Sequence, residues 1–194
     1  VDGDTLKALV AREGPLSPAR AVHILRQTAR ALAEAHAHGI VHRDIKPDNI
    51  LVTSMGGEPD FVKVMDFGIA KLAVVDDHDA ALTHAGMLVG TPTYMSPEQA
   101  AARHVDARSD LYSLGGVLFF ALTGRPPFQG SLSTLLLAHL SDVAPRPSTY
   151  SPHAVSPELD ALVQRCLAKS PDSRHLSALD LDAAILRRCL RLVE

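Results

Sequence analysis

The feature that most constrains this chain is a polar run framed by apolar residues, GIVHRDIKPDNILV at positions 39–52. Ile40 and Val41 precede the charged and amide side chains, and an apolar tripeptide at 50–52 follows them. A surface loop has no need of apolar residues on both sides, whereas two short buried segments would hold polar groups between them. The stretch therefore predicts a polar site held between buried segments.

Length, charge and hydropathy limit the kind of protein this is. The chain has 194 residues, 46% of them hydrophobic and 21% charged, which fits one folded domain. Its formal net charge of −3 argues against a nucleic-acid partner that is bound by bulk neutralisation of phosphates. The longest apolar run, at 111–124, is shorter than a membrane span and holds two adjacent glycines, so we expect no membrane segment in this chain.

The cysteines indicate the compartment. Cys166 and Cys189 have no paired-ligand spacing and are too few for a disulfide framework, so we expect buried free thiols. Free thiols fit a reducing compartment, and no signal peptide opens the chain. The expected location is the cytoplasm.

Helix signals dominate most of the chain. Ser17-Pro18 and Ser156-Pro157 each place a hydroxyl N-cap before a proline, and Gly39 and Gly124 are typical helix ends. The periodicity predicts helices over 17–39, 108–123, 131–140, 156–166 and from about 177 onward.

The remaining signals indicate one small hairpin and one long loop. Two β-type runs, 50–52 and 61–64, are joined by the turn-forming segment SMGGEPD. Residues 66–98 show no sustained periodicity, and a loop of that length in a compact domain tends to be functional. The expected fold class is mainly α with one small β-hairpin.

Four side chains of the polar stretches suit phosphoryl transfer, a reaction that asks the protein mostly for positioning and charge neutralisation. Asp66 offers a carboxylate and Asn49 an amide oxygen, the hard ligands that Mg²⁺ takes together with phosphate oxygens. Asp44 is suited to accept or orient the proton of an attacking hydroxyl, and Lys46 is a compact charge for a phosphate.

Three motifs together resemble the protein kinase family, and in particular the Ser/Thr kinases of bacteria. They are H-R-D-x-x-x-x-N at 42–49, D-F-G at 66–68 and GTPTYMSPEQA at 90–100. The resemblance covers 1–194 but only the family's carboxy-terminal lobe. It implies a hinge end at 1–5, a catalytic loop at 42–49, an activation segment at 66–98, and a protein-kinase-like helical lobe whose hairpin carries the catalytic and metal-binding loops, with the amino-terminal lobe absent.

The resemblance implies the same catalytic roles for Asp44, Lys46 and Asn49, and makes Asn49 and Asp66 the ligands of Mg²⁺ or Mn²⁺. Lys46 stands two positions after Asp44, as in Ser/Thr-directed members, so a Ser or Thr of a protein is the expected substrate.

The resemblance also implies an ATP site. Val1 would offer its backbone to the adenine ring and Leu51 would form the floor under that ring, while Lys46, Asn49 and Asp66 reach the phosphates and their metal.

Five further residues receive structural roles by resemblance. His42 and Phe67 belong to a hydrophobic stack, Glu98 and Arg174 form a buried ion pair, and Asp110 bonds the backbone of the catalytic loop.

Regulation and substrate contact are expected in the long loop. Arg43 beside the catalytic Asp is suited to hold a phosphorylated side chain, with Thr83 as the candidate acceptor. Ala85 replaces a second threonine that bacterial relatives carry, so an unmodified loop threonine stays an open alternative. Thr91 matches the threonine that contacts the catalytic Asp and lines the substrate groove.

Alternatives to an active protein kinase stay open from the sequence. The chain contains no G-x-G-x-x-G and no V-A-I-K lysine, so we expect a fragment whose partner is the kinase amino-terminal lobe and which has little activity alone. A lone lobe acting as a non-catalytic scaffold or regulatory binding module is one alternative. A phosphotransferase for a small alcohol such as an aminoglycoside is another, although Thr91 and the SPEQ tetrapeptide argue against it.

Overall fold

The structure is a computed structural model that describes residues 3–67 and 92–189. Its elements in chain order are β1 (Asp4–Thr5), α1 (Leu6–Glu13), α2 (Pro18–Ala37), the 3₁₀ turn η1 (Pro47–Asn49), β2 (Ile50–Met55), β3 (Glu58–Val64), the 3₁₀ turn η3 (Pro92–Tyr94), α3 (Pro97–Ala100), α4 (Ala107–Thr123), α5 (Leu132–Ser141), η4 (Pro147–Thr149), α6 (Pro157–Cys166), η5 (Pro171–Ser173) and α7 (Ala178–Cys189).

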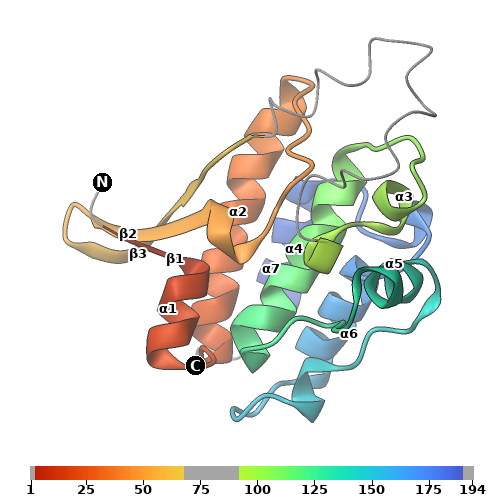
Figure 1. The fold of residues 1–194 in the computed structure, drawn as a ribbon. Coiled ribbons are helices and arrows are strands. Elements are labelled where there is room, and N and C mark those ends of the chain that lie inside the picture. The colour runs from red at the N-terminus through yellow and green to blue at the C-terminus, as the bar shows by residue number, and fades with distance from the viewer. Residues whose placement is uncertain (1–2, 68–91, 190–194) are drawn as a thin grey trace.

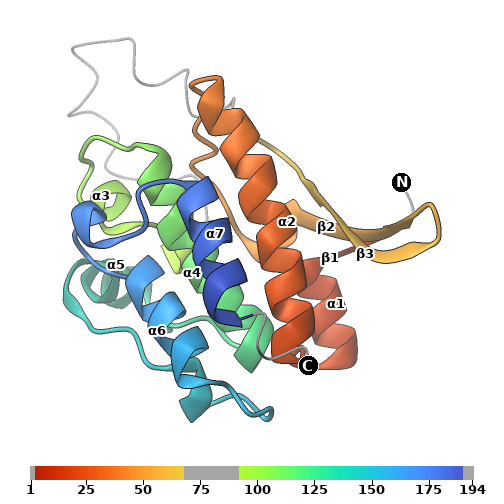
Figure 2. The same cartoon turned by 180° about the vertical axis from the view of Figure 1, so that it is seen from behind.

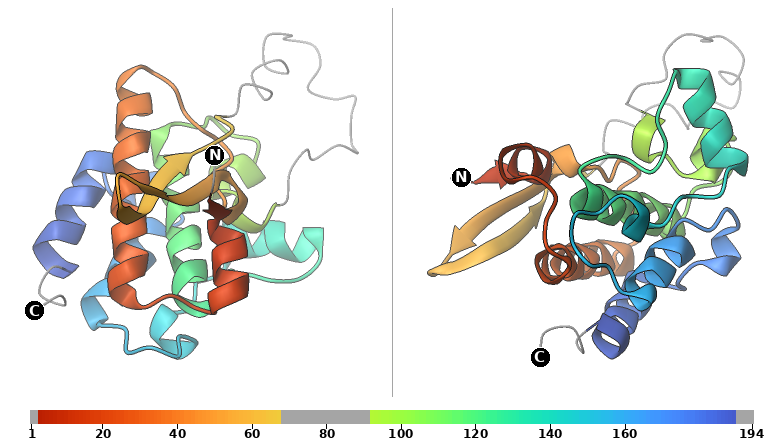
Figure 3. Two further views of the ribbon diagram at one scale, coloured as in Figure 1. Left: turned by 90° about the vertical axis from the view of Figure 1, so that its left-hand side faces the viewer. Right: turned by 90° about the horizontal axis from the view of Figure 1, so that it is seen from below.

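The helices form a bundle around α2 and α4, with the sheet on one flank and α3 and α5 on the other (Figure 1; Figure 2). Helix α2 contacts α4, α7 and strand β3, and α4 also contacts α6. Seen from below, the sheet and the helices α6 and α7 lie on different sides of α2 (Figure 3). The bundle and the sheet both position the loop at 42–49, because His42 N and Arg43 N donate to Asp110 of α4 and Met65 N, just after β3, donates to the Asn49 carbonyl.

Helix α2 begins and ends where its residues dictate. Ser17 Oγ accepts a hydrogen bond from Arg20 N at 3.4 Å, and Pro18 occupies the first turn, as the sequence predicted. Gly39, with φ of 74°, leads the chain out of the helix, and its N–H bonds the carbonyl of His36 at 3.0 Å.

Helix α4 is buried along almost its whole length. Asp106 caps its first turn by accepting from Arg108 N, and Gly124 ends it in a left-handed conformation with φ of 73°. Polar residues inside it must therefore find partners in the protein. Thr123 Oγ1 bonds the Phe119 carbonyl at 2.7 Å, and Asp110 serves the catalytic loop, as described below.

The predicted hairpin forms between β2 and β3, but the prediction that it is the whole sheet is wrong, because the sheet has three antiparallel strands in the order β1-β2-β3. Asp4 and Thr5 pair with Val52 and Leu51, so a third strand joins from the first residues described. A two-residue strand shows no alternation of apolar and polar residues, and only its pairing with a strand far along the chain defines it. Helix α1 was also missed; Thr5 caps it by accepting from Ala8 N at 3.2 Å.

The contact between α4 and α6 yields a stability prediction. A Cβ atom built on Gly115 would lie 2.5 Å from the Cβ of Cys166, closer than packed carbon atoms approach. We expect Gly115→Ala to lower the free energy of unfolding by roughly 1–3 kcal/mol, although alanine favours helices. Urea unfolding measures the loss.

A double-mutant cycle with Cys166→Gly provides the control, since that change removes the atom that the new methyl group meets. Strictly additive effects of the two substitutions would contradict the contact.

Candidate active site

The loop at 42–49 gathers two of the predicted side chains, Lys46 and Asn49, around the Asp44 carboxylate. Lys46 Nζ donates to Asp44 Oδ2 at 2.8 Å. Asn49 Nδ2 donates to the Asp44 carbonyl at 2.8 Å and lies 3.4 Å from Oδ2. The Asn49 amide nitrogen is thus committed to the loop, which leaves Oδ1 as the atom that suits a metal ion.

His42 fastens this loop to the end of β3. Its Nδ1 accepts from Asp44 N at 3.3 Å, so the proton lies on Nε2, which donates to the Met65 carbonyl at 2.8 Å. The ring of Phe67 lies 4.7 Å from the His42 ring, centroid to centroid. His42 is completely buried and acts on the site through Asp44 and Met65.

Asp66 is delivered to the loop by a backbone hydrogen bond. Met65 N donates to the Asn49 carbonyl at 2.9 Å, so the residue after Met65 begins beside Asn49. Asp66 has φ of 55°, a left-handed conformation uncommon outside glycine, and its side chain is exposed. A carboxylate and an amide oxygen are a donor set that fits Mg²⁺ with phosphate oxygens. Within residues 3–67 and 92–189, no group of three or more His, Cys, Asp or Glu side chains is placed to hold a metal.

Asp110, in the first turn of α4, holds the start of the loop. Its carboxylate is buried and accepts from His42 N and Arg43 N, each at 2.8 Å. His36, at the end of α2, donates its Nε2–H to the same carboxylate at 2.8 Å. The sequence showed no sign of this contact, because helical periodicity carries no information on a partner in another helix.

Glu98 and Arg174 form an ion pair in the interior. Arg174 is 1% exposed, and its two terminal nitrogens lie 2.7 and 2.9 Å from the two Glu98 carboxylate oxygens. Ser109 Oγ adds a third hydrogen bond to Glu98 at 2.5 Å. Burial opposes ionisation of Glu98, but the bonds from Arg174 and Ser109 outweigh it, and the net pKa lies below the usual value.

Gln99 contacts the loop at 42–49 in a way that the sequence did not reveal. Its Oε1 accepts from Ser96 N at 3.0 Å, which completes a capping box at the start of α3. Its Nε2 donates to the Arg43 carbonyl at 2.7 Å, so the same side chain ties α3 to the catalytic loop. The S-x-x-Q spacing signals the cap, but nothing local signals the second bond.

The structure leaves some predicted residues untested. Val1, Thr83 and Thr91 lie outside the described residues. Leu51 is half-buried on β2, paired with Thr5 and Lys63, on the strand that follows the catalytic loop directly.

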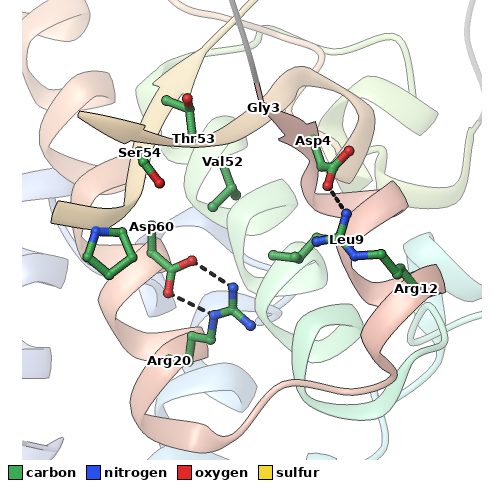
Figure 4. Close-up of a pocket in the computed structure, with 10 residues that line it drawn as sticks. Gly3, Asp4, Leu9, Arg12, Arg20, Val52, Thr53, Ser54 and Asp60 are labelled. Carbon is green, nitrogen blue, oxygen red and sulfur yellow. Dashed lines mark hydrogen bonds and ion pairs between the residues drawn. The ribbon is translucent and has the colours of Figure 1, made fainter. Parts of the chain in front are cut away.

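A hollow of about 560 Å³ lies away from the catalytic loop, between β1, α1, the start of α2 and the β2–β3 hairpin (Figure 4). Arg20 forms two hydrogen bonds of 2.7 Å with Asp60 across it, and Arg12 pairs with Asp4. These ions neutralise one another, and none of the catalytic-loop side chains lines the hollow. The candidate site is therefore the loop at 42–49 rather than this hollow.

Comparison with known proteins identifies the family. The family model described as protein kinase domain matches residues 1–181. The chain belongs to the protein kinase family. It is 48% identical over 185 residues to the serine/threonine-protein kinase PknD of Mycobacterium tuberculosis, covering 95% of this chain and 27% of PknD. It is 45% identical over 180 residues to the serine/threonine-protein kinase pkn3 of Myxococcus xanthus, covering 92% of this chain and 33% of pkn3. These relatives place it among the bacterial Ser/Thr kinases.

Solved structures agree with this assignment. The kinase domain of Mycobacterium tuberculosis PknI superposes with a TM-score of 0.71 at 26% identity, over 97% of this chain and 63% of that one. Rad53 in complex with AMP-PNP gives a TM-score of 0.75 at 27% identity, over 94% of this chain and 43% of that one. The chain spans about a third or less of the length of the curated relatives PknD and pkn3.

The prediction that this chain is a carboxy-terminal lobe with the amino-terminal lobe absent is wrong. The match is to a protein kinase domain over residues 1–181, and the structure adds a third strand to the predicted hairpin. The expectation arose from the absence of two short motifs, and the absence of a motif does not measure how much of a domain is present.

In the part of the chain that the structure describes, no helix is long and apolar enough to cross a membrane.

The buried ion pair predicts an asymmetry between two cation deletions. Arg174→Met leaves the Glu98 carboxylate buried without its counter-ion, so we expect a loss of about 3–5 kcal/mol in unfolding free energy. Lys7→Met breaks an exposed pair with Asp48 and should cost less than about 1 kcal/mol. Chemical denaturation of both variants measures the difference, and equal losses would contradict the role given to Glu98.

The lowered pKa of Glu98 predicts acid sensitivity. Because its folded pKa lies below the usual 4.5, the unfolded chain binds more protons in that range, and stability is lost as pH falls through it. Unfolding free energies measured across this pH range should fall less steeply in Glu98→Gln, once corrected for its lower starting stability. Glu158→Gln, on the exposed surface of α6, should keep the wild-type slope.

Proposed function

We propose that this chain carries the catalytic and metal-binding loops of a Ser/Thr protein kinase, which transfers the γ-phosphoryl group of ATP to a Ser or Thr hydroxyl of a protein. The observation that supports it most is the Asp44 carboxylate, which accepts from Lys46 at 2.8 Å and from Asn49 at 3.4 Å, beside the segment that delivers Asp66. Family membership and the names of the bacterial relatives are consistent with it.

The residues divide the reaction between them. Asp44 orients the attacking hydroxyl and accepts its proton, while Lys46, bonded to the same carboxylate, is placed to neutralise the transferring phosphate. Asn49 Oδ1 and the Asp66 carboxylate would hold Mg²⁺, or Mn²⁺, which supplies charge neutralisation to the ATP phosphates. His42 and Asp110 are positioning residues, because they act through the backbone of the loop.

Three predicted contacts remain part of the proposal. Val1 and Leu51 contribute to the adenine site, and Thr91 faces the protein substrate. Arg43 and a phosphorylated Thr83 form the regulatory pair. We place the reaction in the cytoplasm, because Cys166 is a free buried thiol of the kind found in reducing compartments.

We also propose that these 194 residues by themselves turn over slowly. The family's mechanism uses a Gly-rich loop over the phosphates and a lysine on a strand, and neither motif occurs in the sequence.

The experiment is a phosphorylation assay with the natural protein that carries this sequence, a general protein substrate and radiolabelled ATP. We expect Asp44→Asn to lower kcat by about 10²–10⁴-fold, since it removes the proton acceptor. We expect Asp66→Asn to raise the Mg²⁺ concentration required.

Asp172→Asn is the matched control, the same chemical change at a side chain that is 88% exposed, and should leave activity unchanged. Wild-type rates in Asp44→Asn would refute the proposed mechanism.

A further inference from the structure

Helix α2 contacts both of the segments that build the candidate site. Near its carboxy-terminal end, His36 bonds the Asp110 carboxylate, which in turn accepts from the backbone at the start of the loop at 42–49. Earlier along its length, α2 contacts β3, the strand that leads to Asp66. The polar contacts between α2 and β3 have no part in the site described above.

Gln27 of α2 closes the outer edge of β3. The strand order is β1-β2-β3, and within residues 3–67 and 92–189 no further strand pairs with β3 on the side away from β2. Val62 N donates to Gln27 Oε1 at 3.1 Å, and Gln27 Nε2 donates to the Asp60 carbonyl at 2.7 Å. Because a backbone N–H can only donate, these partners fix which way the amide points. One side chain thus bonds two backbone groups that a neighbouring strand would otherwise take.

Arg20 of α2 holds the side chain of the same Asp60. Its Nε and one terminal nitrogen donate to the two carboxylate oxygens, each at 2.7 Å, in a bidentate pair (Figure 4). The Asp60 side chain is 17% exposed, so this pair is largely shielded from water.

Asp60 is a point at which the ladder between the strands does not by itself fix β3. Its φ of 58° is left-handed, a conformation that persists outside glycine only where the surroundings hold it. The register between β2 and β3 also shifts here, between Thr53 and Met55. The two side chains of α2 therefore supply the contacts that hold the strand at this irregularity.

The strand leads from Asp60 directly to the candidate metal ligands. Residues 62–64 pair with 50–52, and Met65 N then donates to the Asn49 carbonyl at 2.9 Å. Asp66 follows at once. A hairpin depends on packing against a helix for its stability, so a β3 released from α2 would shift Asp66 relative to Asn49.

We propose that Gln27 and Arg20 are positioning residues for the metal site, because by holding β3 against α2 they set where Asp66 stands relative to Asn49. The same helix anchors the loop that carries Asn49, through His36 and Asp110, so α2 is the common support of both ligands. The inference rests on the proposed function, since it concerns the Mg²⁺ of that same site.

Gln27→Met in the natural protein that carries this sequence tests the proposal, since it keeps the size of the side chain and removes both hydrogen bonds. We expect the Mg²⁺ concentration for half-maximal phosphorylation to rise roughly threefold to tenfold, less than when a group bonded directly to a metal ligand is lost. The KM for the protein substrate and the kcat at saturating Mg²⁺ should stay within about twofold of wild type. Arg20→Met should act in the same direction, because it releases Asp60.

Gln164→Met is the matched control. Gln164 of α6 also donates to two backbone groups, the carbonyls of Ala144 and Pro145, at 2.8 and 3.0 Å. Neither carbonyl belongs to β3 or to the loop at 42–49. This variant should lose stability as Gln27→Met does, and its Mg²⁺ requirement should stay that of wild type.

Hydrogen exchange gives a readout that needs no catalysis. The amide of Met65 reports on the bond between the end of β3 and Asn49. Its exchange should be roughly fivefold to tenfold faster in Gln27→Met and unchanged in Gln164→Met, while amides inside α2 keep their protection.

An unchanged Mg²⁺ requirement in Gln27→Met or in Arg20→Met would overturn the role of that residue, and an equal rise in Gln164→Met would overturn both roles. Should the natural protein phosphorylate no protein substrate, the proposed function fails, and the Met65 amide still decides whether Gln27 holds β3. Should Gln27→Met fail to fold, Gln27→Glu makes the same comparison, because it keeps the acceptor for Val62 N and removes the donor to Asp60.

Discussion

The buried carboxylate of Asp110 is the constraint on which the site depends. It accepts from the backbone N–H groups of His42 and Arg43 and from the ring of His36, so one anion fixes the entry to the catalytic loop. A buried carboxylate without such donors would be strongly disfavoured, and the donors would be left without an acceptor. Asp110 lies on α4, which is buried along almost its whole length. Its hydrogen bonds therefore fix the start of the loop to the hydrophobic core.

Further contacts hold the site together, and each connects two segments that are distant in the sequence. His42 links the loop to Met65, and Gln99 links Arg43 to α3. Arg174 then holds α3 to the carboxy-terminal part of the chain through Glu98. Such networks specify one geometry only when their members are satisfied.

Much of this could be predicted from the sequence. The motifs at 42–49 and 66–68 identified the residues that the structure brings together, because the chemistry of phosphoryl transfer restricts which side chains can serve. The caps Ser17 and Ser156 placed helix starts to within a residue, since capping is a local hydrogen bond. The strand β1 and the helix α1 were not predicted, and neither were the contacts of His36 and Gln99.

The sequence by itself determined the family, the candidate site residues and the positions of the main helices, all of which depend on residues close together in the chain. Only the tertiary structure decided which polar groups meet. His36 and Asp110 are 74 positions apart, and Arg174 and Glu98 are 76 apart. A hydrogen bond between such residues leaves no periodicity or spacing in the sequence, because its geometry exists only once α2, α4 and the segments around them have packed.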